Sequence, residues 1–173
     1  IVLEEEAHAR ARGAKILARV SGYGMTSDGH HLTGPHADGL GLRLAILRAL
    51  ARAGIEPGDV GYINPHATST PQGDLAEHRA LAAVFGDRLA SIPISATKSM
   101  LGHLLGGAGG VEAAVTVLSL RDQRIHPSLN ADELDEGVAL DLPKQARAVD
   151  LAYALKLSAG FGGHNCALVF GRA

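Results

Sequence analysis

The sequence is poor in several residue types, and each shortage narrows the possible functions. It has one cysteine, no tryptophan and an aromatic content of 3% over 173 residues. A single cysteine excludes an internal disulfide, and no apolar run approaches the length of about 20 residues that a membrane-spanning helix needs. Sixteen basic against eighteen acidic residues give a net charge of -2, which favours neither a nucleic acid nor a membrane as partner. No signal-peptide pattern opens the chain, so we expect a cytoplasmic protein.

Hydrophobic residues make up 46% of the chain, which is enough for a real core in one domain or in one half of a larger fold. The chain opens on three apolar residues, Ile1 to Leu3, without a methionine. We interpret them as the end of a buried strand, and the chain as a fragment of a longer protein.

The spacing of apolar residues predicts an α/β domain built in layers. Helices are predicted at residues 4–13, 39–53, 73–85 and 111–120, and strands at 15–25, 60–64, 92–95, 153–157 and 166–170. The last two strands flank a glycine loop and should pair as an antiparallel hairpin. The helix at 111–120 is almost wholly apolar, so we expect it to be buried on every side.

Two histidines lie in loops that follow predicted strands. His66 comes just after the strand at 60–64, and three hydroxyl residues, 68–70, follow it. A strand end can present an imidazole to a substrate, but a histidine that only caps a turn accounts for this local pattern equally well. His103 precedes a glycine-rich stretch, 106–110, against which we expect a large neighbour to pack.

Two further residues, Glu112 and Cys166, could have either a functional or a structural role. Glu112 is the one charge between His103 and Arg121, in a helix that otherwise lacks a solvent face. A buried carboxylate needs a cation or a hydrogen-bond network, so a structural network and support of a site are equally open. Cys166 lies in an apolar strand with no base nearby in sequence, which favours a buried packing cysteine over a nucleophile.

Other patterns argue against a nucleotide cofactor and against a metal. Gly160 to Gly163 precede a strand rather than a helix N-terminus, so this loop is not a phosphate-binding loop. His30, His31 and His36 lack a zinc spacing with carboxylate or thiolate partners, and we expect no metal site.

Three motifs together resemble the beta-ketoacyl-acyl-carrier-protein synthases, condensing enzymes of the thiolase superfamily. They are Asn64-Pro65-His66-Ala67-Thr68-Ser69-Thr70-Pro71, Lys98-Ser99-Met100-Leu101-Gly102-His103-Leu104-Leu105-Gly106 and Gly160-Phe161-Gly162-Gly163-His164-Asn165. The resemblance covers essentially the whole chain and is to the type II elongating synthases. It implies the C-terminal half of a duplicated fold of α-β-α layers. Residues 1–14 would then end the N-terminal half, and residues 15–173 would form the C-terminal domain.

The resemblance also implies the roles of several residues. His66 and His103 would be the two histidines of a Cys-His-His site, and Lys98 would be the lysine that sets its electrostatics. Glu112 would be the buried glutamate behind His103. The acylated cysteine of the family belongs to the N-terminal half, so this chain alone would be an inactive part of an acyltransferase.

Substrate contacts follow from the same resemblance. Thr68 and Thr70 would bind the phosphopantetheine arm, and Phe161 would be a gate whose backbone amide contributes to an oxyanion hole. Acyl and malonyl groups would arrive as thioesters on an acyl carrier protein, for fatty-acid or related polyketide synthesis, without a cofactor. Implied partners are therefore the carrier protein, the N-terminal half and a second protomer in a homodimer.

The chain departs from the family at two places. Pro65 and Ala67 stand where alanine and glycine are usual, which stiffens the loop around His66. Lys156-Leu157-Ser158-Ala159 replaces a typical Ser-Asn-Ser-Phe and so removes the asparagine and phenylalanine that hold Phe161.

Two other functions compete with a condensing enzyme. A degradative thiolase is disfavoured, because the site typical of that branch is Cys-His-Cys, whereas this chain has two histidines. The other alternative is a non-catalytic partner subunit, or a fragment that binds carrier protein or a second protomer. The presence of both histidines and Lys98 argues against a partner that has lost its chemistry.

Overall fold

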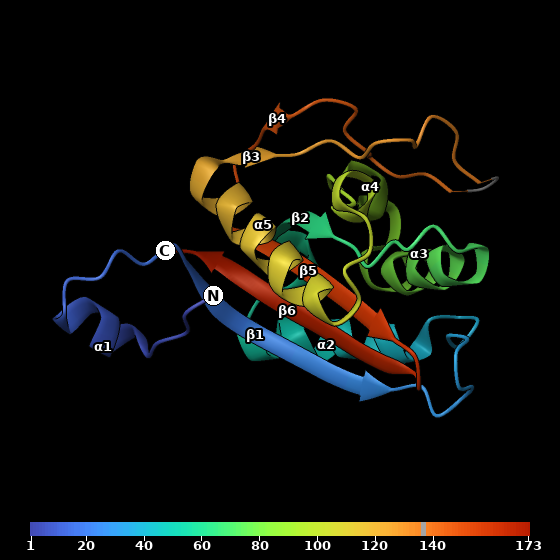
Figure 1. Cartoon of the computed structure of the whole chain (residues 1–173), viewed down its shortest axis with the longest axis horizontal. Coiled ribbons are helices and arrows are strands. Elements are labelled where there is room, and N and C mark those ends of the chain that lie inside the picture. Colours follow the sequence, from blue (N-terminus) through green and yellow to red (C-terminus); the bar gives the residue numbers. More distant parts are fainter. Residues whose placement is uncertain (136–137) are drawn as a thin grey trace.

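One mixed sheet forms the centre of the structure, a computed structural model that describes residues 1–135 and 138–173 (Figure 1). Its strand order is β1-β6-β5-β2, and only β2 and β5 run parallel. The strands are β1 (Ala18–Ser27), β2 (Val60–Asn64), β5 (Tyr153–Gly160) and β6 (His164–Arg172). The predicted final hairpin is confirmed, because β5 and β6 pair antiparallel from Tyr153↔Gly171 to Gly160↔His164.

Helices cover both faces of this sheet, which gives the α-β-α layers that we expected. The helices α2 (Leu40–Ala53) and α3 (Pro71–Phe85) lie on one face, and α5 (Ala108–Asp122) crosses the other, in front of β5 and β6 in Figure 1. The smaller elements are α1 (Glu6–Ala11), α4 (Lys98–Leu101), β3 (Arg124–Ile125) and β4 (Arg147–Ala148). No helix within the described ranges is long and apolar enough to cross a membrane.

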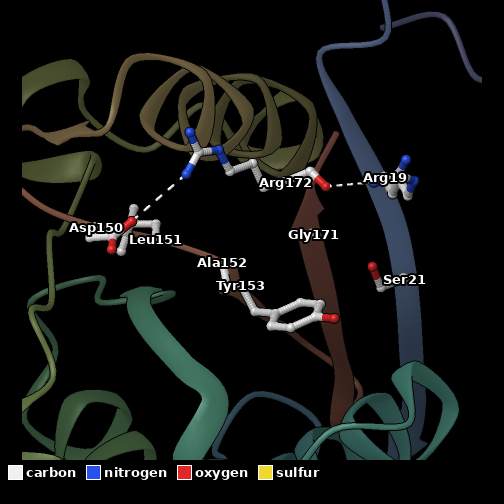
Figure 2. Close-up of a pocket in the computed structure, with 8 residues that line it drawn as sticks. All are labelled: Arg19, Ser21, Asp150, Leu151, Ala152, Tyr153, Gly171 and Arg172. Atoms are coloured by element: carbon white, nitrogen blue, oxygen red, sulfur yellow. Dashed lines mark hydrogen bonds and ion pairs between the residues drawn. The ribbon is translucent and has the colours of Figure 1, made fainter.

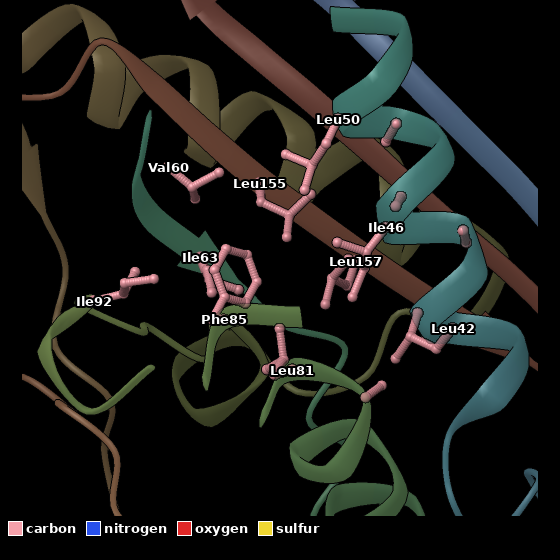
Figure 3. Close-up of a cluster of buried hydrophobic side chains, with 14 of the residues drawn as sticks. Leu42, Ile46, Leu50, Val60, Ile63, Leu81, Phe85, Ile92, Leu155 and Leu157 are labelled. Atoms are coloured by element: carbon pink, nitrogen blue, oxygen red, sulfur yellow. The ribbon is translucent and has the colours of Figure 1, made fainter. Parts of the chain in front are cut away.

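Alternation along β5 separates the core from the site. Leu155 and Leu157 point into the larger hydrophobic cluster, where they meet Ile46 and Leu50 of α2 (Figure 3). A strand turns successive side chains to opposite faces, so Lys156 points toward α5 instead. The sheet therefore places an apolar core on one side and a lysine on the other.

Glycines in β1 explain how closely α2 packs on the sheet. A Cβ on Gly24 would lie 1.9 Å from the carbonyl oxygen of Ala45, and one on Gly22 would lie 2.2 Å from that of Ala49. Any larger residue at these two positions would push the helix off the strand.

Three expectations about the chain's surface were wrong. Ile1–Leu3 are 75–83% exposed and form no strand, because no described strand lies beside them to pair with. Helix α5 is buried only toward the sheet, and Leu118 on its outer side is 40% exposed because no described layer covers that side. For the same reason, a Cβ on Gly106 or Gly110 would meet no described atom within 4 Å.

The segment predicted as a strand at 92–95 forms only isolated bridges. Ile94 pairs with Ile63 of β2, and Pro93 pairs with Asp141. One bridge to each neighbour is too little for a regular ladder, so the segment extends the sheet without becoming one of its strands.

Candidate active site

The predicted site residues come from four elements that meet beyond the C-terminal end of β2. His66 follows that end, Lys98 begins α4, His103 lies between α4 and α5, and Glu112 lies in the first turns of α5. The fold thus brings together side chains that are far apart in the sequence.

The two histidines are neighbours. Their ring centroids are 5.5 Å apart and the ring planes are nearly perpendicular, at 86°. His103 is exposed, and its Nδ1 accepts a hydrogen bond of 3.2 Å from the backbone N–H of Leu105. A neutral ring that accepts at Nδ1 carries its proton on Nε2, so His103 presents an N–H donor.

Buried charges hold the His66 loop from both sides. The carboxylate of Glu77, in α3, accepts the backbone N–H groups of His66 at 2.7 Å and of Ala67 at 2.8 Å. The ammonium of Lys98 donates to the carbonyl oxygen of His66. Ala67 has φ of 36°, a left-handed conformation that favours the glycine usual at this position and strains an alanine.

Glu112 lies between two lysines in the interior. Lys98 Nζ is 2.6 Å from Glu112 Oε1, and Lys156 Nζ is 2.7 Å from Oε2. The approach of Lys156 lies outside hydrogen-bond geometry, so charge alone holds Oε2. Nearby, the amide of Asn64 donates to Thr97 Oγ1 at 2.9 Å and to Thr116 Oγ1 at 3.1 Å, which ties β2 to α5.

This setting keeps His66 uncharged. Burial, followed by the charges of Lys98 and Lys156 and by His103, lowers the pKa of His66 to about 3. Burial also raises the pKa of Glu77, although the two backbone N–H groups it accepts oppose that shift. A neutral imidazole at position 66 remains a donor or an acceptor over the whole physiological range.

A cleft of about 600 Å³ opens beside these groups. Its lining includes Lys98, His103 and Thr68, and it runs between α3 and residues from the stretches 128–135 and 138–142. The hydroxyls of Thr68 and Thr70 are 3.0 Å apart, and Thr70 itself is exposed. His66 does not line the cleft directly.

Two predicted residues lie elsewhere. Phe161 is 77% exposed in the turn between β5 and β6 and is not part of the cleft's lining. Cys166 is half-buried rather than buried, because its side of β6 faces the partly open α5 layer. Burial still raises the pKa of the Cys166 thiol, so it is a poor thiolate.

A second, smaller pocket of about 220 Å³ lies near the start of β5, away from both histidines (Figure 2). Arg19 donates to the backbone oxygen of Arg172 at 2.7 Å, and Arg172 reaches Asp150 at 3.7 Å. These contacts join β1, β6 and the segment before β5 at one end of the sheet, and they offer no nucleophile paired with a base. In the described part of the chain, no three His, Cys, Asp or Glu side chains cluster as metal ligands.

Sequence reasoning missed two charged residues of the site. Glu77 lies three residues before Ala80 and four before Leu81, within the buried stripe of its helix, and this spacing is a usable signal. Lys156 stands between two core leucines in a strand covered on both faces, which also predicts a buried ammonium.

We expect the low pKa of His66 to make folding sensitive to acid. Between its ordinary value of 6.5 and its folded value of about 3, the unfolded chain binds a proton that folded His66 does not. The free energy of unfolding should therefore fall as pH decreases through this window. Above the window His66 causes no loss, and below it the loss is complete and no longer changes with pH.

Urea unfolding from pH 7 to pH 4 measures this loss. His66→Gln should reduce the loss, whereas His8→Gln, on the exposed α1, should leave it as in the unsubstituted chain. An equal loss in the His66 variant would contradict the assignment of a neutral, half-buried imidazole.

Comparisons with known proteins agree with this geometry. Residues 17–132 match the family model "Beta-ketoacyl synthase, C-terminal domain". The chain is 51% identical to a 3-oxoacyl-[acyl-carrier-protein] synthase 2 of Vibrio harveyi over 98% of its own length and 41% of that synthase's. The chain thus spans about two-fifths of the length of such relatives.

Solved structures show the same fold. A type II polyketide ketosynthase, in complex with its acyl carrier protein and bound to a hexaketide, has a TM-score of 0.94 at 37% identity, over 98% of this chain and 42% of that one. A ketosynthase of Xenorhabdus doucetiae in complex with its chain length factor has a TM-score of 0.84 at 33% identity, over 92% of this chain and 40% of that one. The chain belongs to the beta-ketoacyl synthase family, and it corresponds to the C-terminal half of a type II elongating synthase.

Proposed function

We propose that this chain is the C-terminal half of a synthase that condenses an acyl thioester with malonyl-carrier protein and releases carbon dioxide. The observation that carries the proposal is the pair of adjacent imidazoles, His66 and His103, beside the buried ammonium of Lys98. The nucleophilic cysteine would come from the N-terminal half. We call this chain together with that half the assembled enzyme.

The chemistry gives each group a task. Loss of carbon dioxide from a malonyl thioester leaves an enolate whose oxygen needs hydrogen-bond donors that are already in place. Neutral imidazoles at His66 and His103 supply N–H donors, and Lys98 adds a positive field. The enolate carbon then attacks the acyl-cysteine carbonyl, and the cysteine sulfur leaves as the new carbon–carbon bond forms.

The cleft suits a long arm that brings the thioester to the histidines. Thr68 lines the cleft, and the hydroxyl of Thr70 is 3.0 Å from that of Thr68, so both would bind the phosphopantetheine of the acyl carrier protein. The condensation needs no external oxidant or reductant, and imidazole N–H groups and Lys98 would stabilise the enolate, so the proposed reaction uses no redox cofactor and no metal. A homodimer in the cytoplasm completes the proposal.

A condensation assay tests this proposal. The assembled enzyme, incubated with acyl- and malonyl-carrier protein, should release carbon dioxide and form a 3-oxoacyl thioester in equal amounts. The alternative is a non-catalytic partner subunit, and it predicts neither product. If a folded preparation formed neither product, the result would contradict the proposed function.

Phe161 gives a separate prediction for acyl-chain selection. Its exposed ring lies between glycines, and Gly162 and Gly163 have φ of 81° and 76°, so the turn has the backbone freedom to move a bulky side chain. Phe161→Ala in the assembled enzyme should change acyl-chain preference or transfer rate and leave the melting temperature nearly unchanged. An unchanged substrate profile with a collapsed melting temperature would make Phe161 a structural residue.

A further inference from the structure

The middle of β5 carries a buried lysine for which the proposed reaction has assigned no task. Lys156 is 2% exposed, and its neighbours in register are Asn64 of β2 and Leu168 of β6. Burying an ammonium is costly unless an anion and hydrogen bonds compensate it. A serine is usual at this position in the beta-ketoacyl synthases, so the charge is a feature of this chain.

The surroundings of Lys156 contain more positive charge than Glu112 can balance. Besides Glu112, its ammonium contacts Ser158 Oγ at 3.2 Å and the backbone oxygen of Leu157. Glu112 is already paired with Lys98, so two ammoniums share one carboxylate. Both lysines and this carboxylate lie in the interior, where water screens charges weakly.

Four further titratable groups face the cluster. Cys166 on β6 interacts with Lys156, and Tyr62 on β2 interacts with Glu112. From α3, the carboxylate of Glu77 adds a second negative charge, and its oxygens accept backbone N–H groups of the His66 loop. His103 approaches from the segment before α5. The lysines and carboxylates of the cluster balance in number, but the two lysines act most strongly on His66: Lys98 donates to its carbonyl oxygen, and both ammoniums oppose a charge on its ring.

We propose that Lys156 is a second positioning lysine of the site, which holds Glu112 Oε2 and keeps the neighbouring His66 in its uncharged, donating form. This inference rests on the proposed function for its consequence in catalysis. A positive charge raises the cost of placing a second positive charge on the imidazole. The same charge favours the negative enolate oxygen that the imidazole would face.

The direction of the His66 pKa agrees with this role. Burial is the first cause of its low value and Lys98 the second, and Lys156 is the third cause, ahead of His103. Burial lowers the pKa of Lys156 as well, while Glu112 opposes that shift. Removal of the Lys156 charge should thus allow His66 to take up a proton at a higher pH.

The test is the pH profile of malonyl decarboxylation by the assembled enzyme carrying Lys156→Met, which keeps the length of the side chain without its charge. Loss of one nearby like charge should move the acid limb about 1 pH unit higher. Lys144→Met is the matched control, because Lys144 is exposed and forms an ion pair with the exposed Asp132, at 3.0 Å. Its acid limb should coincide with that of the unsubstituted enzyme.

A second measurement keeps the test decisive if Lys156→Met fails to fold. Lys156→Ser carries the residue usual in the family, and the His66 pKa can be followed by NMR in histidine-labelled protein. An acid limb and a His66 titration that do not move in a folded variant would overturn the role of Lys156. Unfolding of both variants would assign the lysine to folding alone and overturn it too. A lack of decarboxylation by the unsubstituted enzyme would refute the proposed function instead, and the NMR titration would still report on Lys156.

Discussion

Replacing His66 or His103 with alanine in the assembled enzyme should slow malonyl decarboxylation by about 10²–10³-fold in each case. The reason is that each change removes one N–H donor from the oxygen that becomes negative when carbon dioxide leaves. The rings are 5.5 Å apart, so one oxygen can lie within reach of both. Release of labelled carbon dioxide from malonyl-carrier protein measures the effect directly.

The control for this prediction is a histidine away from the site. His8→Ala changes an exposed ring on α1 and should leave the rate unchanged. Near-normal decarboxylation by the His66 or the His103 variant would remove that histidine from the proposed role.

Glu112→Gln should destabilise the chain by about 3–5 kcal/mol, because removing one partner of a buried ion pair leaves charge uncompensated. Here the neutral amide would leave two ammoniums, Lys98 and Lys156, facing each other's charge in the interior. Urea unfolding at pH 7 measures the loss.

A double variant tests the cause of this loss. Glu112→Gln combined with Lys156→Met leaves only one unpaired ammonium, so it should be more stable than Glu112→Gln alone. If Glu112→Gln alone lowered the free energy of unfolding by less than about 1 kcal/mol, water or the loss of a proton from a lysine would be compensating the removed charge. That result would contradict the burial described for this cluster.

The sequence predicts the layers of the fold because its apolar patterns are local. The helix predicted at 39–53 forms α2, which begins one residue later and ends at the predicted residue. The strand predicted at 60–64 forms β2 with the same bounds. The exposure of one side of α5 could not be predicted in the same way. An apolar pattern predicts a buried helix, but it does not show whether another layer packs on the outer face.

The candidate site was predictable only in part. Local patterns selected His66 and His103, but only the resemblance placed them together, since their contact joins two separate loops. Glu77 and Lys156 act through tertiary contacts, to a backbone loop and to a glutamate on another element. Strand alternation and helical spacing would have marked both as buried, but no local pattern names their partners.

The most direct measurement is the mapping of acylated residues by peptide mass spectrometry, after the assembled enzyme and this chain alone have each been incubated with acyl-carrier protein. The half-buried Cys166, whose thiol has a raised pKa, should stay unlabelled in both samples. The account predicts a thioester on a cysteine of the N-terminal half in the assembled enzyme, and no label on the chain alone. Stable acylation of Cys166 would contradict it.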